Sequence, residues 1–186
     1  MSIFLNDIIT PRLIIRLLGE EVTNACLDNN LETAQQLLHA TIPAEFLNEL
    51  NSLQNDCRQL REDPAYRPWA SRAILLKNEM KTIGLVRFHS SPELHADKPY
   101  RKGAVELGYH IFSDYRRKGY ARETILGLID WAAVHFSVHR FIVSISPENL
   151  PSLELARSFG FIKTDEVVDE IDGLEYVYLL DRQLNT

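Results

Sequence analysis

The sequence contains few residues that bind metal ions or form disulfide bonds. Only two cysteines occur among its 186 residues, Cys26 and Cys57, and the six histidines are scattered along the chain. Neither cysteine has a Cys or His beside it at the spacing of metal ligands, and both stand in polar, helix-like contexts. We therefore expect no metal site and two thiols that are buried or half-buried.

Long apolar runs and an excess of positive charge are also lacking. The first residues, "MSIFLNDIIT", have no charged segment followed by a long apolar one, and no run approaches the roughly 18 apolar residues of a membrane span. The formal net charge is -6, so the chain as a whole repels nucleic acids and anionic membrane surfaces. We expect a cytoplasmic protein with neither nucleic acid nor membrane as a partner.

Length and composition favour one folded domain over residues 1–186. The chain is 45% hydrophobic and 25% charged, which is ordinary for a globular protein. Residues 12–18 ("RLIIRLL") are apolar and β-branched and predict a first strand, and residues 20–62 favour helices. From Pro43 on, an apolar stripe with helical spacing predicts one amphipathic helix that faces the core. The stripe consists of Phe46, Leu50, Leu53, Cys57 and Leu60.

The remaining pattern alternates strands and helices. A hairpin is predicted at 71–89 with its turn at "NEMK", followed by a strand over 104–112 and a helix over 119–136. The last part predicts a strand at 139–146, a helix ending at Gly160 and a hairpin over 161–182 that turns near Asp172 and Gly173. The fold class is therefore α/β, with a mixed, mostly antiparallel sheet of about seven strands flanked by helices.

Two common phosphate-binding patterns are absent, GxxxxGK[ST] and GxGxxG, yet one stretch still predicts an anion site. "SDYRRKGYARE", residues 113–123, places three cations between a strand and a helix. Unpaired amides and the positive end of the helix dipole converge at such a turn, and Gly119 allows close backbone approach. A solvated charge run is the alternative interpretation of the same triplet.

The motifs in and around this stretch resemble the GCN5-related N-acetyltransferase (GNAT) superfamily. "RRKGYA" fits its R/Q-x-x-G-x-G/A pyrophosphate loop, with Arg116, Gly119 and Ala121 at the defining positions. "NLPSLELARSFGF", residues 149–161, is similar to its second signature. "TPRLIIRLL" and "VELGYHIFSDYRRKGYARE" resemble the branch that contains the ribosomal-protein-alanine N-acetyltransferases.

The resemblance implies acetyl-coenzyme A as cosubstrate and a sheet that is splayed at its two central strands. The pyrophosphate would be held at Arg116–Ala121, mainly by the amides from Arg117 to Ala121. The pantetheine arm would hydrogen-bond to the strand of residues 107–111, and Asn149 and Ser152 would lie beside the thioester. Asn149 has the alternative role of a helix cap. The implied cofactor-binding residues are Leu107, Gly108, Tyr109, His110, Ile111, Arg116, Arg117, Lys118, Gly119, Tyr120, Ala121, Asn149 and Ser152.

Acetylation of an amine needs a base, because an alkyl ammonium has a pKa of about 10.4. Glu106 matches a position where several superfamily members carry a catalytic Glu, and a solvent-facing strand carboxylate is the alternative. Strand alternation puts Glu106 on one face with Gly108 and His110, and His110 is expected to be structural. Many members protonate the thiolate with a Tyr at the position of Ala156, so the general acid here is Ser152, Tyr109 or water.

Two classes of function stay open. The first is an N-acetyltransferase that works by direct transfer in a ternary complex, as a monomer or homodimer, with a protein N-terminus or a small amine as acceptor. The second is a non-catalytic coenzyme A sensor, which the missing Tyr at Ala156 makes conceivable. The acidic stretch 165–173 either attracts a cationic acceptor or is a solvated hairpin.

Overall fold

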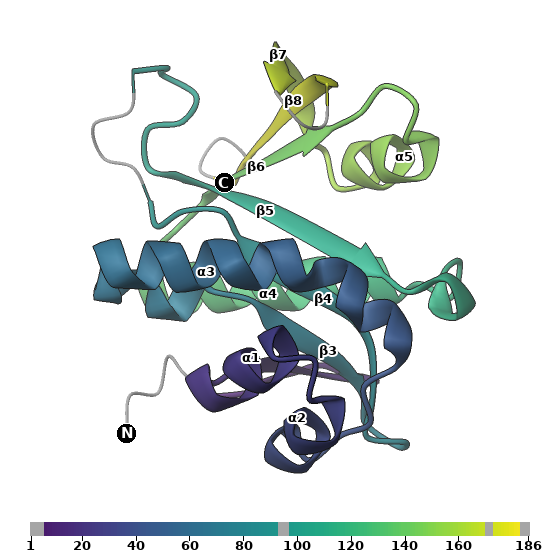
Figure 1. Cartoon of the computed structure of the whole chain (residues 1–186). Coiled ribbons are helices and arrows are strands. Elements are labelled where there is room, and N and C mark those ends of the chain that lie inside the picture. The colour runs from purple at the N-terminus through teal and green to yellow at the C-terminus, as the bar shows by residue number, and fades with distance from the viewer. Residues whose placement is uncertain (1–5, 93–96, 170–172, 183–186) are drawn as a thin grey trace. The chain divides into compact units, whose positions relative to one another are not determined.

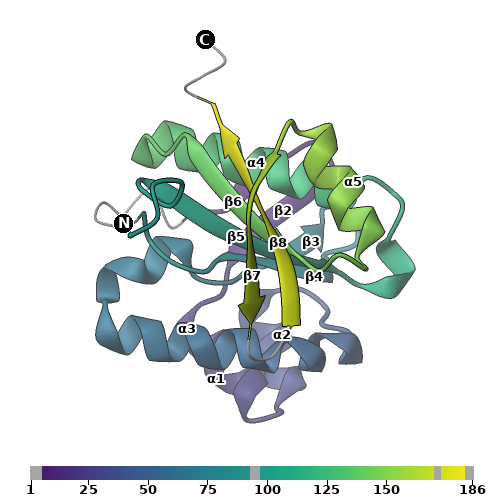
Figure 2. The same ribbon diagram turned by 90° about the horizontal axis from the view of Figure 1, so that it is seen from above.

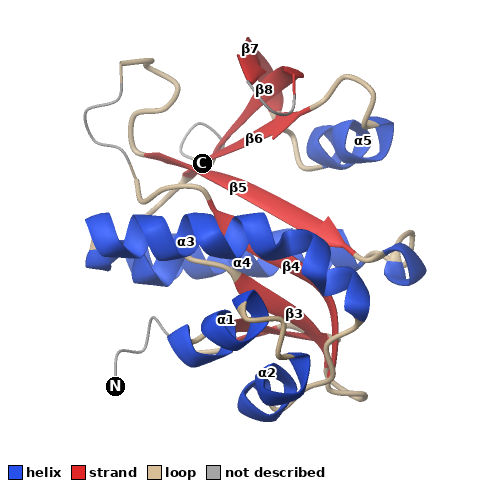
Figure 3. Ribbon diagram, in the orientation of Figure 1, coloured by secondary structure: helices blue, strands red, loops and turns tan. Residues whose placement is uncertain are grey.

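A computed structural model describes residues 6–92, 97–169 and 173–182. The helical elements are α1 Glu20–Leu27, α2 Leu31–Leu38, η2 Ala44–Glu49, α3 Leu50–Glu62, η3 Pro64–Trp69, η4 Ser113–Tyr115, α4 Tyr120–Phe136 and α5 Leu150–Ser158. The strands are β1 Ile8–Ile9, β2 Leu13–Leu17, β3 Arg72–Leu76, β4 Lys81–Phe88, β5 Ala104–Ile111, β6 Arg140–Ile145, β7 Ile162–Asp169 and β8 Gly173–Asp181. Figure 3 distinguishes the helices from the strands.

The strands follow the order β1-β2-β3-β4-β5-β6-β8-β7, which confirms the predicted mixed sheet flanked by helices. The described residues contain eight strands, one more than the seven expected. The additional strand is β1, and its two residues are too few for an alternating pattern to be visible in the sequence. The chain divides into two compact units: unit 1 is Met1–Phe88 with Tyr109–Leu128, and unit 2 is His89–Gly108 with Ile129–Thr186.

In unit 1, strands β1 to β4 form an antiparallel meander with helices on both faces. α1, α2 and α3 lie on one face, and the first half of α4 lies on the other (Figure 1). Ile14 packs against the core cluster of α1 to α3, whereas a Cβ on Gly127 of α4 would lie 3.5 Å from Ile15. Because consecutive strand residues point to opposite faces, these two isoleucines anchor the two layers.

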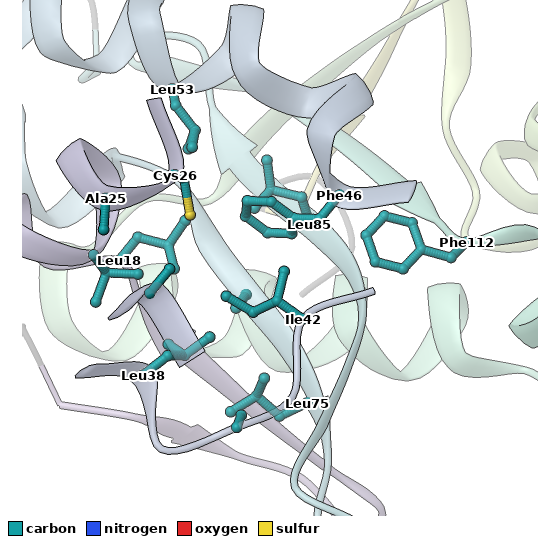
Figure 4. Packing of buried hydrophobic residues seen from close by; sticks show 14 residues of the cluster. Leu18, Ala25, Cys26, Leu38, Ile42, Phe46, Leu53, Leu75, Leu85 and Phe112 are labelled. Atoms are coloured by element: carbon teal, nitrogen blue, oxygen red, sulfur yellow. The ribbon is translucent and has the colours of Figure 1, made fainter. Parts of the chain in front are cut away.

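The core of unit 1 reaches the end of β5. Figure 4 shows Phe46, Leu53 and Phe112 within one cluster of buried side chains that also includes Cys26. The rings of Phe46 and Phe112 meet edge to face, with centroids 6.4 Å apart. The predicted stripe is therefore a core contact, and it fixes the residue directly after β5. Cys26 is buried, which raises the pKa of its thiol to about 11, and Cys57 is half-buried.

The helix predicted from Pro43 onward begins differently. Residues Ala44–Glu49 form the 3-10 segment η2, with the Phe46 amide donating to the Pro43 carbonyl at 3.0 Å, and regular α-helix starts only at Leu50. The spacing of apolar residues does not distinguish i+3 from i+4 bonding over a single turn. This segment matters for the site because it carries Glu45 and Glu49.

In unit 2, β6 lies between a parallel and an antiparallel neighbour. β5 pairs with β6 in parallel only from Ala104 to Glu106, which lie opposite Arg140 to Ile142. β8 pairs with β6 and with β7 in antiparallel fashion, and Figure 2 views these strands from above. Pairing of β5 with β6 thus ends at Glu106, although β6 continues to Ile145, as expected for splayed strands. Asp172 of the predicted hairpin turn lies outside the described residues, and Gly173 begins β8.

Within the ranges that the structure describes, no helix is both long enough and apolar enough to cross a bilayer.

Candidate functional site

The basic turn of unit 1 has an unusual backbone. It follows β5 as the short helical turn η4, visible beyond the arrowhead of β5 (Figure 3), and ends where α4 begins at Tyr120. Gly119 has a φ of 80°, a left-handed conformation that suits glycine. Arg117 has a φ of 61°, which costs a residue with a side chain about 1–2 kcal/mol. Non-glycine residues in such conformations concentrate at functional sites.

The backbone amides of residues 117–121 are available to a ligand. The first helical bond of α4 runs from the Glu123 amide to the Gly119 carbonyl at 3.1 Å. Among the described residues, none accepts a hydrogen bond from the amides of 117–121. Free amides at the positive end of a 17-residue helix form a site for an anion, and the arrangement fits a pyrophosphate.

The Arg116 side chain holds the turn itself. Its Nε donates to the Ile111 carbonyl at 2.8 Å, and its Nη2 lies 2.9 Å from His110 Nε2. A guanidinium only donates, so Nε2 is the acceptor and the ring proton is on Nδ1. That nitrogen lies 2.8 Å from Glu49 Oε1 and donates to it. Through these two contacts His110 links η2 to the turn.

A second acidic residue from η2 fixes the start of the turn. The carboxylate of Glu45 accepts hydrogen bonds from the Ser113 amide and the Ser113 hydroxyl, both at 3.1 Å. These bonds immobilise η4 ahead of the basic residues.

A third contact, between Arg12 and Glu123, holds the far end of the turn. Arg12 donates through Nε to Glu123 Oε2 at 2.6 Å and through Nη1 to the Lys118 carbonyl at 2.9 Å. Its guanidinium also lies over the Tyr120 ring, 4.5 Å from the centroid. Burial alone would raise the pKa of Glu123, but hydrogen bonds from Thr10 and from the Arg12 backbone and side chain outweigh it and lower that pKa.

Only one of the three cations of the triplet has no partner in the described chain. Lys118 donates to the Asp114 carbonyl at 2.8 Å, and Arg116 is engaged as above, whereas Arg117 is exposed and makes no hydrogen bond or ion pair with a described residue. The turn is therefore more than a solvated charge run, because most of its charged side chains stabilise its shape.

Unit 2 contains the predicted base, Glu106, in a bonded cluster. Its Oε2 accepts from Arg101 Nη1 at 3.0 Å, and its Oε1 accepts from the Ser144 hydroxyl at 2.5 Å. The side chain is 12% exposed, so Glu106 does not simply face solvent. Ser144 lies on β6, two residues beyond the point where pairing with β5 ends. Sequence reasoning identified Glu106 but neither of these partners.

The second signature, residues 149–161, contains the whole of α5. Asn149 Oδ1 accepts from the Ser152 amide at 3.3 Å, so Asn149 is the N-cap of this helix. Ser152 is half-buried, and Ala156 is buried with no hydroxyl to offer. On β5, Leu107 and Ile111 are buried, and Gly108, Tyr109 and His110 are half-buried.

The described residues contain no group of three or more His, Cys, Asp or Glu side chains that could hold a metal ion. His135 and His139 stand four residues apart, which is a metal-ligand spacing only within a helix. α4 ends at Phe136, so His139 lies outside the helix.

Comparison with known proteins identifies the family. A family model described as an acetyltransferase (GNAT) domain matches residues 12–162. The chain belongs to the GNAT family. The family predicted from "RRKGYA" and "NLPSLELARSFGF" is thereby confirmed, and the matched range includes both motifs.

Two curated GNAT relatives are named N-acetyltransferases. The chain is 28% identical over 113 residues to the uncharacterized N-acetyltransferase p20 of Bacillus licheniformis, and the match covers 60% of each chain. It is 29% identical over 89 residues to the uncharacterized N-acetyltransferase YjdG of Bacillus subtilis (strain 168), covering 48% of this chain and 49% of the relative. The matched part thus spans about half to 60% of the length of these relatives.

Solved GNAT structures are similar over nearly the whole chain. A ribosomal-protein-S5-alanine acetyltransferase from Vibrio fischeri aligns with 95% of this chain and 96% of its own, with a TM-score of 0.62 and 20% identity. RimL, a ribosomal L7/L12 acetyltransferase in complex with coenzyme A, is similar over 95% of this chain and 98% of the RimL chain, with a TM-score of 0.63 and 16% identity. At these identities the similarity shows the GNAT fold.

Proposed function

We propose that this GNAT protein transfers the acetyl group of acetyl-coenzyme A to a primary amine by direct attack in a ternary complex. The observation that carries the proposal is the set of unpaired amides at residues 117–121, on a turn held by Glu49, Glu45 and Glu123. A rigid anion site costs little reorganisation when the pyrophosphate binds. The coenzyme A complex of RimL, on the same fold, supports this ligand.

The remaining ligand contacts are proposed for each unit separately. In unit 2, the backbone of Leu107 and Gly108 binds pantetheine where β5 no longer pairs with β6, and Asn149 and Ser152 lie beside the thioester. In unit 1, the backbone of Tyr109 to Ile111 continues that strand toward the turn.

The proposed chemistry uses few side chains. Glu106 is the base that deprotonates the amine. Ser152 is the acid that protonates the leaving thiolate, with Tyr109 or water as the alternative acid. A thiol has a pKa of about 8.5, so a weak acid suffices for this step. We favour a protein or peptide N-terminus over a small amine as acceptor, in a cytoplasmic setting.

The binding step is tested with Gly119→Val. A side chain at a φ of 80° strains the turn, and its Cβ would lie 3.3 Å from Arg12 Nη2. We expect calorimetry to show acetyl-coenzyme A affinity reduced at least tenfold while the protein stays folded. Gly173→Val is the matched control, because Gly173 also has a positive φ of 74° but lies in the β7–β8 hairpin. Equal affinity in wild type and Gly119→Val contradicts the assignment.

A coenzyme A sensor is the second candidate, and the buried Ala156 favours it because this position supplies no acid. The two functions separate in a screen of peptides with free N-termini and of small amines. Release of thiol from acetyl-coenzyme A together with a mass increase of the acceptor supports transfer. Tight binding without either product supports the sensor.

A further inference from the structure

Glu106 of unit 2 is held both at its backbone and at its carboxylate. Its carbonyl accepts from the His89 amide at 2.7 Å, and in the sheet it lies opposite Ile142 of β6. With the backbone fixed, the place of the carboxylate depends on the side-chain torsions. Arg101 and Ser144 restrict these torsions. Arg101 Nη1 donates to Oε2 at 3.0 Å, and the Ser144 hydroxyl donates to Oε1 at 2.5 Å.

The bond from Ser144 sets the direction in which the carboxylate points. β5 and β6 run parallel, and Glu106 is the last residue of β5 that pairs with β6. Ser144 stands two residues beyond Ile142, the partner of Glu106. By the same register, Ser144 lies level with Gly108 along the strands. The hydroxyl therefore draws Oε1 forward, past the paired segment and toward the part of β5 where the proposed pantetheine contacts begin.

Arg101 belongs to a loop that precedes β5 and is itself anchored on unit 2. The Tyr100 hydroxyl donates to Asp165 of β7 at 2.8 Å, and Arg140 of β6 donates to the Pro99 carbonyl at 3.3 Å. The guanidinium is thus presented by a loop that is fixed to two strands. Because the Arg101 side chain is only 31% exposed, solvent screens its attraction to the carboxylate only in part.

We propose that Ser144 and Arg101 are positioning residues of the acetyl transfer, which hold the Glu106 carboxylate in one orientation along β5. This inference rests on the proposed function, in which Glu106 is the base. A base acts within hydrogen-bond distance of the proton that it removes, directly or through one water. A carboxylate that rotates about its side-chain torsions spends less time in that geometry, so fixing it raises the rate. Ser144 and Arg101 act through Glu106 alone.

The proton steps balance without either positioning residue. The ammonium of the acceptor gives one proton to the Glu106 carboxylate, and the neutral amine attacks the thioester carbonyl. A C–N bond forms and the C–S bond breaks. The acid protonates the leaving thiolate and regains a proton from the new N–H group, and Glu106 releases its proton to water. The products are the amide, the thiol and one proton.

The test is steady-state kinetics with acetyl-coenzyme A and a hexapeptide that begins with alanine, and with spermidine as a second acceptor. We expect kcat of Ser144→Ala to fall about tenfold, the effect of losing one hydrogen bond to a charged group, with KM for acetyl-coenzyme A unchanged. Ser144→Thr keeps the hydroxyl and should recover most of the lost rate. Arg101→Gln should lose a similar factor, and Arg101→Lys, which keeps the charge, should recover part of it.

A double-mutant cycle separates positioning from a structural role. Because Ser144 acts through Glu106, Ser144→Ala should lower kcat of the wild type but have little further effect in a Glu106→Gln background. A residue that only supports the sheet, or that touches a substrate itself, costs the same factor in both backgrounds. Arg101→Gln is combined with Glu106→Gln in the same way.

Matched controls remove a similar group elsewhere in unit 2. Thr164→Ala removes an exposed hydroxyl from β7, and Arg182→Gln removes a surface arginine that pairs with Asp130. Both should turn over as the wild type does. Thermal melting and calorimetric titration with acetyl-coenzyme A check that each variant folds and binds its cosubstrate.

The proposal is overturned if Ser144→Ala turns over within a factor of two of the wild type, or if its loss is the same in the Glu106→Gln background. If Ser144→Ala does not fold, the cycle with Arg101→Gln decides by the same criteria. Failure of the proposed function looks different, because the wild type then acetylates neither the hexapeptide nor spermidine, and the inference falls with it. An active wild type with an unaffected Ser144→Ala contradicts the inference alone.

Discussion

The turn of unit 1 and the Glu106 cluster of unit 2 use side chains in opposite ways. In the turn, side chains bind the protein's own backbone: Arg116 holds Ile111, Lys118 holds Asp114, and Arg12 holds Lys118. We propose that the backbone amides of the turn bind the ligand. In the cluster, side chains bind side chains: Arg101 and Ser144 each donate to one oxygen of the Glu106 carboxylate. In our proposal a motif rich in charge is a binding site made of backbone amides, whereas the chemistry depends on the side chains of the Glu106 cluster.

The largest expected effect comes from Glu106→Gln. Loss of the carboxylate leaves cofactor binding intact but should lower kcat roughly 10²- to 10⁴-fold at neutral pH. The rate should partly recover at high pH, where the amine loses its proton unaided. Steady-state kinetics and calorimetry measure the two quantities separately.

The control for that variant is Glu166→Gln, which removes an exposed carboxylate paired with Lys163 on β7. Near-normal turnover of Glu106→Gln at all pH values shows that Glu106 serves only the fold.

A smaller effect, on binding alone, is expected for Glu123→Gln in the turn. The neutral Gln side chain at position 123 accepts a weaker hydrogen bond from Arg12 Nε than the charged carboxylate does. Arg12 is then held less firmly, and so is its bond to the Lys118 carbonyl. Because Arg12 is 48% exposed, we expect only about a tenfold weaker affinity for acetyl-coenzyme A. kcat at saturation should be unchanged, which is the reverse of Glu106→Gln.

Asp130→Asn is the matched control for Glu123→Gln. It removes another acid–arginine pair from α4, the one with Arg182, away from the turn. A fall in kcat with unchanged affinity in Glu123→Gln contradicts the separation of binding from chemistry.

Ser152→Ala should have a modest effect. If Ser152 protonates the thiolate, turnover falls about fivefold, the value of one ordinary hydrogen bond, with acetyl-coenzyme A affinity retained. Ser158→Ala on the same helix is the control, because Ser158 donates to the Leu155 carbonyl. Equal losses of affinity and turnover mark Ser152 as a cofactor contact instead.

The smallest effect concerns stability at low pH. The pKa of Glu123 is lower in the folded protein, so its contribution to stability is complete above the ordinary carboxylate pKa of about 4.3. That contribution is lost as the pH falls through the folded pKa. Between pH 5 and pH 3, the melting temperature should therefore fall further in wild type than in Glu123→Gln. If the melting temperatures of wild type and Glu123→Gln fall equally over this pH range, Glu123 is not held by Thr10 and Arg12 in solution.

Local features of the fold and the site were predictable from the sequence, whereas contacts between distant residues were not. Gly119 and the three cations are contiguous, so the turn and the helix after it could be predicted. The position of Glu106 on the strand ahead of the turn could also be predicted. Its partners, Arg101 and Ser144, are 5 and 38 positions away, and nothing in their local patterns marks them.

The same limit explains the missed Arg12–Glu123 contact and the 3-10 segment η2. Both residues of the contact lie in stretches that carried the family resemblance, but only the fold shows that they meet. Periodicity likewise predicts which side of a segment is buried, as for Phe46, but not the hydrogen-bond pattern of its first turn.

The Arg12–Glu123 contact also bears on the order of folding. It closes a loop of 111 residues, whereas the bond from Arg116 to Ile111 spans only 5. The longer closure costs about 3 kcal/mol more in chain entropy. The early part of the turn can therefore form with β5, while its last support waits until the first strands dock. During refolding, the ability to bind acetyl-coenzyme A should appear after most secondary structure has formed.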